Sequence, residues 1–147
     1  MMMDNLFNST VETELRVLVL LHECKMPQSI DMLHAIDFMS IYAKSFGIGE
    51  YNLNGENSYM FSEFAAKRES IQGALKDLVL RGLIVPLEMD SGIKYEIDFD
   101  GEDLCDSLDS EYAAEYRHMV NQVLADVENT DEREIIVRIE RKSGQVL

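Results

Sequence analysis

Residues 71–101 read IQGALKDLVLRGLIVPLEMDSGIKYEIDFDG, and this stretch combines a helical pattern with the pattern of a β-hairpin. Ile71, Leu75 and Leu78 recur at helical spacing, so one face of its first half is apolar. Gly82 stands where such a helix would end, and glycine enters the left-handed cap conformation without the steric cost of a Cβ atom. The first half therefore predicts an amphipathic helix that stops at a glycine.

The second half of the stretch has the pattern of a β-hairpin. An apolar run begins at Leu83, Ser91-Gly92 supplies a turn, and apolar residues alternate at period two beyond it, namely Ile93, Tyr95, Ile97 and Phe99. Helix, cap, strand, turn and strand form the second half of a winged helix-turn-helix. We therefore predict a mainly α fold with a small β-wing: residues 1–100 as the winged-helix core, and residues 101–147 as a C-terminal helical extension packed on it in a single domain.

Helical patterns flank this stretch on both sides. Predicted helices cover Asn8–Cys24, with Ser9 or Thr10 as cap, Ile30–Phe46, capped by Gln28-Ser29, Glu102–Leu108 and Glu111–Val127. Residues 62–82 fit either one long helix or two helices with a turn. The last element, Asp131–Lys142, fits a helix better than a strand, although its β-branched run Ile135–Ile139 is compatible with both.

The charge of the chain restricts its partners. The formal net charge is -15, from 13 Lys and Arg against 28 Asp and Glu. Proteins that bind duplex nucleic acid gain affinity by neutralising phosphates, and a field this negative opposes that encounter. Residues 61–99 are nearest to neutral, and no segment is basic.

Four cations of the predicted winged region are the candidate nucleic-acid contacts: Lys67, Arg68, Lys76 and Lys94. The alternative is that they are ordinary surface residues paired with nearby acids. The spacing of Glu63 and Lys67, four residues apart on a helix, favours this alternative. We therefore expect DNA contact to be weak or indirect.

Motifs of enzymes are absent from the sequence: it has no P-loop, no dinucleotide-binding glycine pattern and no nucleophile elbow. His22 and His34 stand among apolar residues, which favours core or boundary histidines over metal ligands. Cys24 and Cys105 match no metal spacing and are expected to be buried free thiols in a reducing cytoplasm. We predict no catalytic site, no metal, no cofactor and no membrane-spanning segment.

Two stretches resemble a known family. MDNLFNSTVETELRVLVLL, residues 3–21, and LVLRGLI, residues 78–84, together with the Arg68-Glu69 step, resemble the small middle components of bacterial ABC-three-component systems. The resemblance runs in order and at similar spacing to about residue 128. One departure is that family members often carry more arginine in the third helix, where this chain offers mainly Lys67 and Arg68.

The resemblance implies a non-catalytic winged-helix adaptor. Such a subunit would bind an SMC/Rad50-like ABC ATPase and couple it to an effector subunit in Lamassu-type defence against phages and plasmids. The expected docking element is the N-terminus with the apolar face of the first helix, comprising Leu6, Phe7, Val11 and Leu15. The alternative is a small DNA-binding transcriptional regulator that forms a homodimer through Glu111–Val127.

Overall fold

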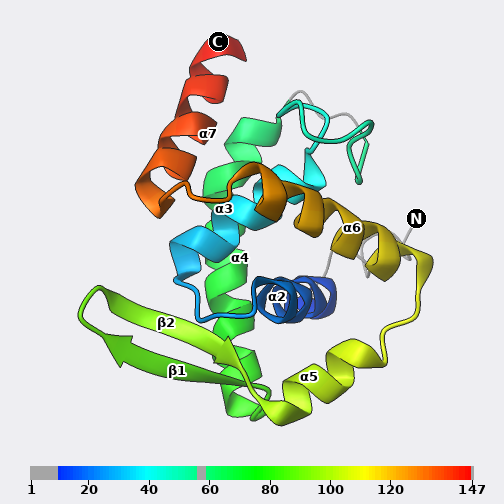
Figure 1. The fold of residues 1–147 in the computed structure, drawn as a ribbon, viewed down its shortest axis with the longest axis vertical. Helices are drawn as coiled ribbons and strands as arrows, with labels where there is room; N and C mark the ends of the chain where they lie inside the picture. Colours follow the sequence, from blue (N-terminus) through cyan, green and yellow to red (C-terminus); the bar gives the residue numbers. More distant parts are fainter. Residues whose placement is uncertain (1–9, 56–58, 147) are drawn as a thin grey trace.

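The computed structural model describes residues 10–55 and 59–146. The helices are α2 (Thr10–Cys24), α3 (Ile30–Ile41), α4 (Met60–Leu80), α5 (Phe99–Asp106), α6 (Glu111–Asp126) and α7 (Glu132–Val146). Strands β1 (Ile84–Met89) and β2 (Gly92–Ile97) pair as one antiparallel hairpin (Figure 1). The fold is mainly helical with a small two-stranded sheet, as the sequence predicts.

Helix α2 occupies the centre of the core. It packs against α3, α4, α5, α6 and β2, and Figure 1 shows it end-on between its neighbours. The five consecutive apolar residues Val17–Leu21 are each 2% exposed or less, because other elements surround the helix on several sides. The same buried cluster includes residues of α6 and α7, so the C-terminal helices complete one shared core.

Helix α3 begins at its predicted cap but is shorter than predicted. The Oγ atom of Ser29 accepts a hydrogen bond from Met32 N at 3.1 Å, which satisfies a free N–H of the first turn. Residues 42–47 form turns instead of continuing the helix to Phe46. Phe46 nevertheless packs on Phe38, with ring centroids 5.8 Å apart. The predicted helix end at Phe46 was therefore wrong, although Phe46 itself is buried.

Helix α4 settles the open question over residues 62–82, because it is one uninterrupted helix. Gly82 follows its last turn with a φ of +75°. Gly82 N donates to Val79 O and Leu83 N donates to Leu78 O, both at 3.0 Å, which is the Schellman pattern. The predicted glycine stop is confirmed.

The hairpin turn lies one residue earlier than predicted. Met89 pairs with Gly92, so Asp90 and Ser91 are the two central turn residues. Gly92 has a φ of +116°, a conformation that favours glycine.

One residue between α2 and α3 extends the hairpin. Gln28 N donates to Tyr95 O at 2.9 Å, and Tyr95 N donates to Gln28 O at 2.8 Å. Both polar backbone groups of Tyr95 thus point to Gln28. The pair that Tyr95 forms with Pro86 on β1 therefore lacks ladder hydrogen bonds, and the Pro86 nitrogen faces the outer edge of β1. Proline has no N–H to offer there, which protects the open edge against strand addition.

The predicted alternation fails at Phe99, which begins α5 instead of continuing β2. Asp98 N turns away to donate to Leu83 O at 3.0 Å, and the Asp98 carboxylate accepts a hydrogen bond from Phe99 N at 2.8 Å as a helix cap. Gly101 then passes so close to the chain after α4 that an added Cβ would lie 2.2 Å from Leu83 O. The start of α5 is therefore fixed against the end of α4.

The two C-terminal helices confirm their predictions. Helix α6 buries Tyr116, Met119, Val120 and Val123, and it packs against α2 and α3. In α7, Ile135 and Ile139 are spaced by one helical turn and are each 1% exposed. The β-branched run thus forms a helix, because helical spacing brings these two side chains onto the core.

Candidate partner-binding surfaces

Two of the four predicted nucleic-acid contacts, Arg68 and Lys67, lie beside acidic side chains of the protein itself. Arg68 Nε donates to Asp31 Oδ1 on α3 at 2.7 Å, so a carboxylate neutralises its charge. Lys67 is half-buried and lines a polar pocket together with Glu63 and Arg16.

The other two cations lie elsewhere. Lys76 is exposed and lies on the opposite side of α4 from Lys67, because nine residues at about 100° each turn the helix to its far side. Lys94 is half-buried on β2, directly across from Leu87. The structure therefore does not bring the four predicted contacts into one patch.

The exposed face of α4 is nearly uncharged. Its exposed residues are Ser62, Ala65, Ala66, Glu69, Ser70, Gln72, Gly73, Lys76 and Leu80. With one cation and one acid, this face has little to offer a phosphate backbone.

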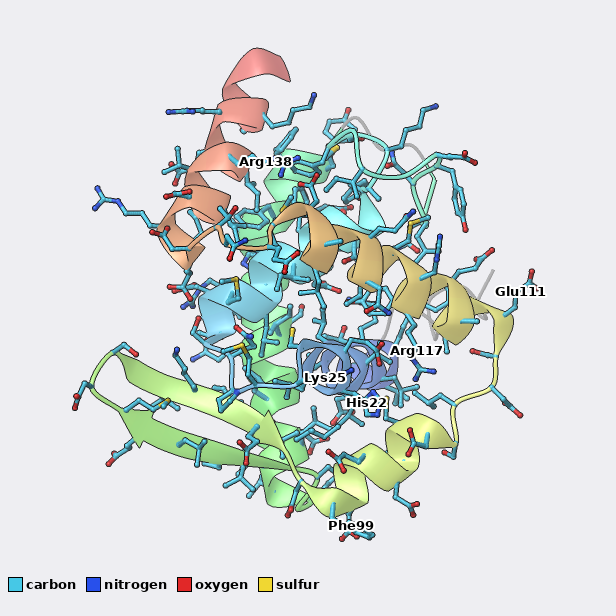
Figure 2. The ribbon with its side chains drawn as sticks, viewed as in Figure 1. His22, Lys25, Phe99, Glu111, Arg117 and Arg138 are labelled. Atoms are coloured by element: carbon cyan, nitrogen blue, oxygen red, sulfur yellow. The ribbon has the colours of Figure 1, made fainter. Side chains whose placement is uncertain are left out.

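Large apolar side chains are exposed where α4 ends and α5 begins. Leu80 is 85% exposed and Phe99 is 76% exposed. Figure 2 shows the Phe99 side chain directed outward at this end of the molecule. Val85 and Met89, on the outer face of the hairpin, are also exposed. Exposed apolar groups gathered at one end are typical of a protein-binding surface.

The predicted N-terminal docking element is described only in part. Leu6 and Phe7 lie outside the described residues. Val11, in the first turn of α2, is 59% exposed, whereas Leu15 one turn later is half-buried.

A buried polar network joins three helices. Arg16 Nε on α2 donates to Asp37 Oδ1 on α3 at 3.0 Å, and the Tyr116 hydroxyl on α6 donates to the same oxygen at 2.5 Å. Arg16 Nη1 also donates to Glu12 Oε1 at 3.2 Å. Burial, followed by the charge of Asp37, raises the pKa of Tyr116 well above its usual value. The network thus holds a charged pair and a neutral phenol in the core, which is a structural role.

A second cluster fastens α5 and α6 to the end of α2. His22 Nδ1 lies 2.6 Å from Glu23 Oε2, and His22 Nε2 lies 3.3 Å from Asp106 on α5. Glu23 also faces Arg117 Nε at 3.6 Å and accepts a hydrogen bond from Asn121 at 2.9 Å, both on α6. Burial raises the pKa of Glu23, and these hydrogen bonds outweigh it, so the net shift is downward. Figure 2 shows His22 and Arg117 close together.

His34 and Cys105 are buried as predicted, whereas Cys24 is less buried than predicted. His34 is 4% exposed and stacks on Phe64 with ring centroids 4.0 Å apart, and burial lowers its pKa. Cys24 and Cys105 are free thiols, half-buried and buried respectively. Burial raises the pKa of Cys24 to about 12, which makes its thiolate scarce at neutral pH.

Glu14 on α2 is a buried carboxyl group with an unusual environment. It is 4% exposed, and its Oε1 atom has no hydrogen-bond partner among the described residues. Burial, assisted by the Asp77 carboxyl on α4 and opposed by Arg81, raises its pKa from 4.5 to about 7.

We expect Glu14 to make the protein less stable as the pH rises. The folded state holds this proton more tightly than the unfolded state, so the stability it contributes is fully present below about pH 4.5 and is lost as the pH rises through about 7. Glu14→Gln should flatten this slope in urea unfolding between about pH 5 and pH 8, and Glu88→Gln on the exposed hairpin should keep it. Equal slopes in wild type and Glu14→Gln would contradict the assignment.

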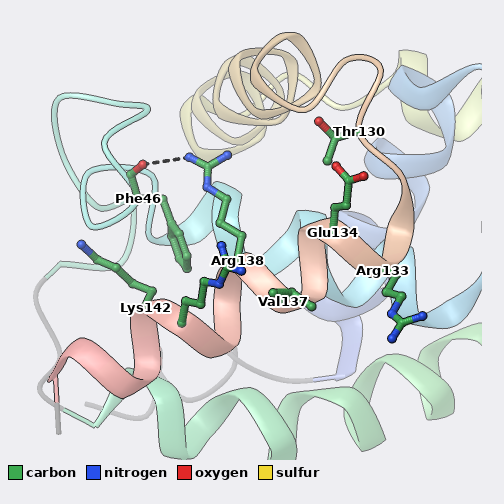
Figure 3. Close-up of a pocket in the computed structure, with 8 residues that line it drawn as sticks. Phe46, Thr130, Arg133, Glu134, Val137, Arg138 and Lys142 are labelled. Carbon is green, nitrogen blue, oxygen red and sulfur yellow. Dashed lines mark hydrogen bonds between the residues drawn. The ribbon is translucent and has the colours of Figure 1, made fainter.

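A groove of about 690 Å³ runs along one face of α7. Its lining comprises the apolar side chains of Val137 and Phe46, the hydroxyl of Thr130, the carboxylate of Glu134 and four cations, Arg133, Arg138, Arg141 and Lys142. Figure 3 shows Phe46 beside α7 and the hydrogen bond from Arg138 Nη2 to Phe46 O, which measures 3.2 Å. Four of the 13 basic residues of an acidic chain thus gather on one helix. The groove was not predicted from the sequence, although the spacing of Arg and Lys within residues 133–142 indicates a basic helix face.

The structure therefore defines an α-helical protein with a small β-hairpin, whose surface offers apolar and basic features suited to binding. The described residues contain no group of three or more His, Cys, Asp or Glu side chains placed to hold a metal ion. Within the same residues, no helix combines the length and apolar character needed to cross a bilayer.

The chain belongs to the family described as ABC-three component (ABC-3C) system Middle Component 2, whose family model matches residues 6–147. This match confirms the resemblance found in the sequence and extends it past residue 128 to the C-terminal helix. Searches of curated proteins and of solved structures found no match.

Proposed function

We propose that this chain is a non-catalytic adaptor of an ABC-3C system. It binds the SMC/Rad50-like ABC ATPase of that system in the cytoplasm and couples it to an effector subunit in defence against phages or plasmids. The observation that carries the proposal is membership of the middle-component family over residues 6–147. A component of a three-component system needs surfaces for its partners, and the exposed Leu80 and Phe99 side chains supply one.

The proposed fold is a winged helix. The order α2, the Gln28 bridge, α3, α4 and the β1–β2 hairpin supports this assignment. In this interpretation α4 takes the place of the recognition helix. The long connection between α3 and α4 differs from the short turn of a DNA-binding helix-turn-helix.

Protein binding fits the surface of α4 better than DNA binding does. A recognition helix that contacts phosphates needs cations on its exposed face, and Lys76 is the exposed cation of α4. The net charge of -15 adds long-range repulsion.

The regulator alternative has less support. Its dimer interface would use the apolar face of α6, and that face packs against α2 and α3 within the chain. A regulator would also bind duplex with a steep loss of affinity as salt increases. We expect the isolated chain to show weak or no duplex binding at any salt concentration.

Assembly with the other components of the system tests the proposed surfaces. Leu80→Asp/Phe99→Asp should weaken the complex at least about tenfold in a pull-down titration, because each change places a charge in an apolar contact. Leu6→Asp/Phe7→Asp should do the same if the N-terminus is the docking element. Met26→Asp, also at an exposed apolar residue, is the matched control and should leave assembly unchanged. Undiminished assembly with both double variants would refute these docking surfaces.

A further inference from the structure

The α7 groove carries more cations than acids, since four cations and one carboxylate, Glu134, line it. Arg138 is already engaged, since it pairs with Asp126 and donates to Phe46 O. Arg133, Arg141 and Lys142 have no acidic partner within 4.0 Å among the residues that the structure describes. Arg133 and Arg141 are exposed, and Lys142 is half-buried.

The spacing of these cations makes a continuous binding face. Arg133, Val137 and Arg141 are each four residues apart and therefore form one row along α7. Glu134, Arg138 and Lys142 form the neighbouring row, which therefore holds one carboxylate and two cations. Cations therefore lie around Val137 on both rows. Arg133 and Arg141, at the two ends of the first row, are about 12 Å apart along the helix axis.

We propose that this groove binds an acidic segment of a protein partner, with an apolar side chain of that segment seated between Val137 and Phe46. The partner is another component of the same ABC-3C assembly, so this inference rests on the proposed function. Guanidinium groups recognise carboxylates through paired hydrogen bonds, which Arg133 and Arg141 are free to make.

The occupant is a protein segment and not a nucleic acid for two reasons. Two apolar side chains, Val137 and Phe46, lie among the cations of the groove, and a phosphate backbone offers them no apolar partner, whereas an acidic segment with an apolar residue matches both kinds of side chain. Duplex DNA carries a phosphate charge about every 1.7 Å, so its approach would bring long-range repulsion from the acidic remainder of this chain. A short acidic segment carries few charges and meets cations locally.

Charge reversal tests the groove. Arg133→Glu/Arg141→Glu should weaken assembly with the co-expressed components at least about tenfold, and wild-type assembly should weaken as salt increases. Both side chains are exposed, so circular dichroism melting should be unchanged. Lys25→Glu reverses the charge of an exposed cation between α2 and α3, outside the groove and the other proposed surfaces, and this control should assemble like wild type.

Cross-linking identifies the occupant directly. A carbodiimide joins an amine to a neighbouring carboxylate without a spacer, so Lys142 should become linked to an Asp or Glu in an acidic partner segment, as read by mass spectrometry. Lys142→Arg should lose this link. If the wild-type chain assembles but the groove variant assembles equally well, or Lys142 links to no partner carboxylate, this inference is wrong and the proposed function stands. If the wild-type chain assembles with no component, the proposed function itself fails.

Discussion

Asp37→Ala should destabilise the protein by about 3–5 kcal/mol, because it leaves the buried guanidinium of Arg16 without its main partner. Arg16 is 5% exposed and Asp37 is 1% exposed, so water cannot replace the lost carboxylate. The Tyr116 hydroxyl would lose its acceptor in the same step. Urea unfolding followed by far-UV circular dichroism measures the change.

Asp31→Ala is the matched control on the same helix. Its carboxylate pairs with Arg68 at 2.7 Å, but both side chains are nearly half exposed, so the loss should be at most about 1 kcal/mol. Replacing the whole network, as Glu12→Leu/Arg16→Met/Asp37→Leu/Tyr116→Phe, should recover much of the stability, since no buried charge of the network remains. Equal costs for Asp37→Ala and Asp31→Ala would contradict the structural role of the network.

Gly101→Ala should have the second largest effect, a loss of about 2–3 kcal/mol. The added methyl would lie 2.2 Å from Leu83 O and 2.8 Å from the Ile97 side chain. The carbonyl cannot move freely, because it accepts the hydrogen bond of Asp98 N at 3.0 Å. We expect a lower thermal midpoint, measured by calorimetry, because α5 must shift away from the end of α4.

Gly73→Ala is the control for Gly101→Ala. Gly73 lies inside α4, and an added Cβ there meets nothing within 4 Å. The substitution should therefore stabilise the protein by about 0.5–1 kcal/mol through helix propensity alone. If both alanine variants were stabilised, the close approach at Gly101 would be disproved.

Local signals in the sequence were enough to predict most elements of the fold. The glycine stop at Gly82, the Ser29 cap and the helical spacing of Ile135 and Ile139 each depend on residues within one or two turns. Helix caps, glycine stops and helical spacing can therefore be recognised in the sequence without knowledge of the rest of the chain. The resemblance carried by residues 3–21 and 78–84 supplied the family, which composition and periodicity could not.

What the sequence did not predict depends on contacts between distant residues. Phe99 continued an alternating pattern, yet a hydrogen bond from Asp98 to Leu83 redirects the chain there. Arg16 and Asp37 each interrupt an apolar helix, which signals a buried polar residue, but only the fold makes them partners.

The arrangement of cations on the surface also depends on contacts between distant residues, so it was not predicted from the sequence. Lys67 and Lys76 are close in sequence but lie on opposite sides of α4, so proximity along the chain did not make a patch. The cations of α7 stand among many acidic residues of the C-terminal part of the chain, so the charge of that segment as a whole does not reveal them. Their significance depends on Phe46, which reaches the groove from the turn after α3.

The most direct test of the adaptor role is native mass spectrometry of the tagged, full-length chain co-expressed with its neighbouring genes. An adaptor should be recovered in a complex of defined stoichiometry that contains an SMC-like ABC ATPase. Recovery of the chain alone, or as a homodimer that binds its own promoter DNA, would contradict the adaptor role and favour a regulator.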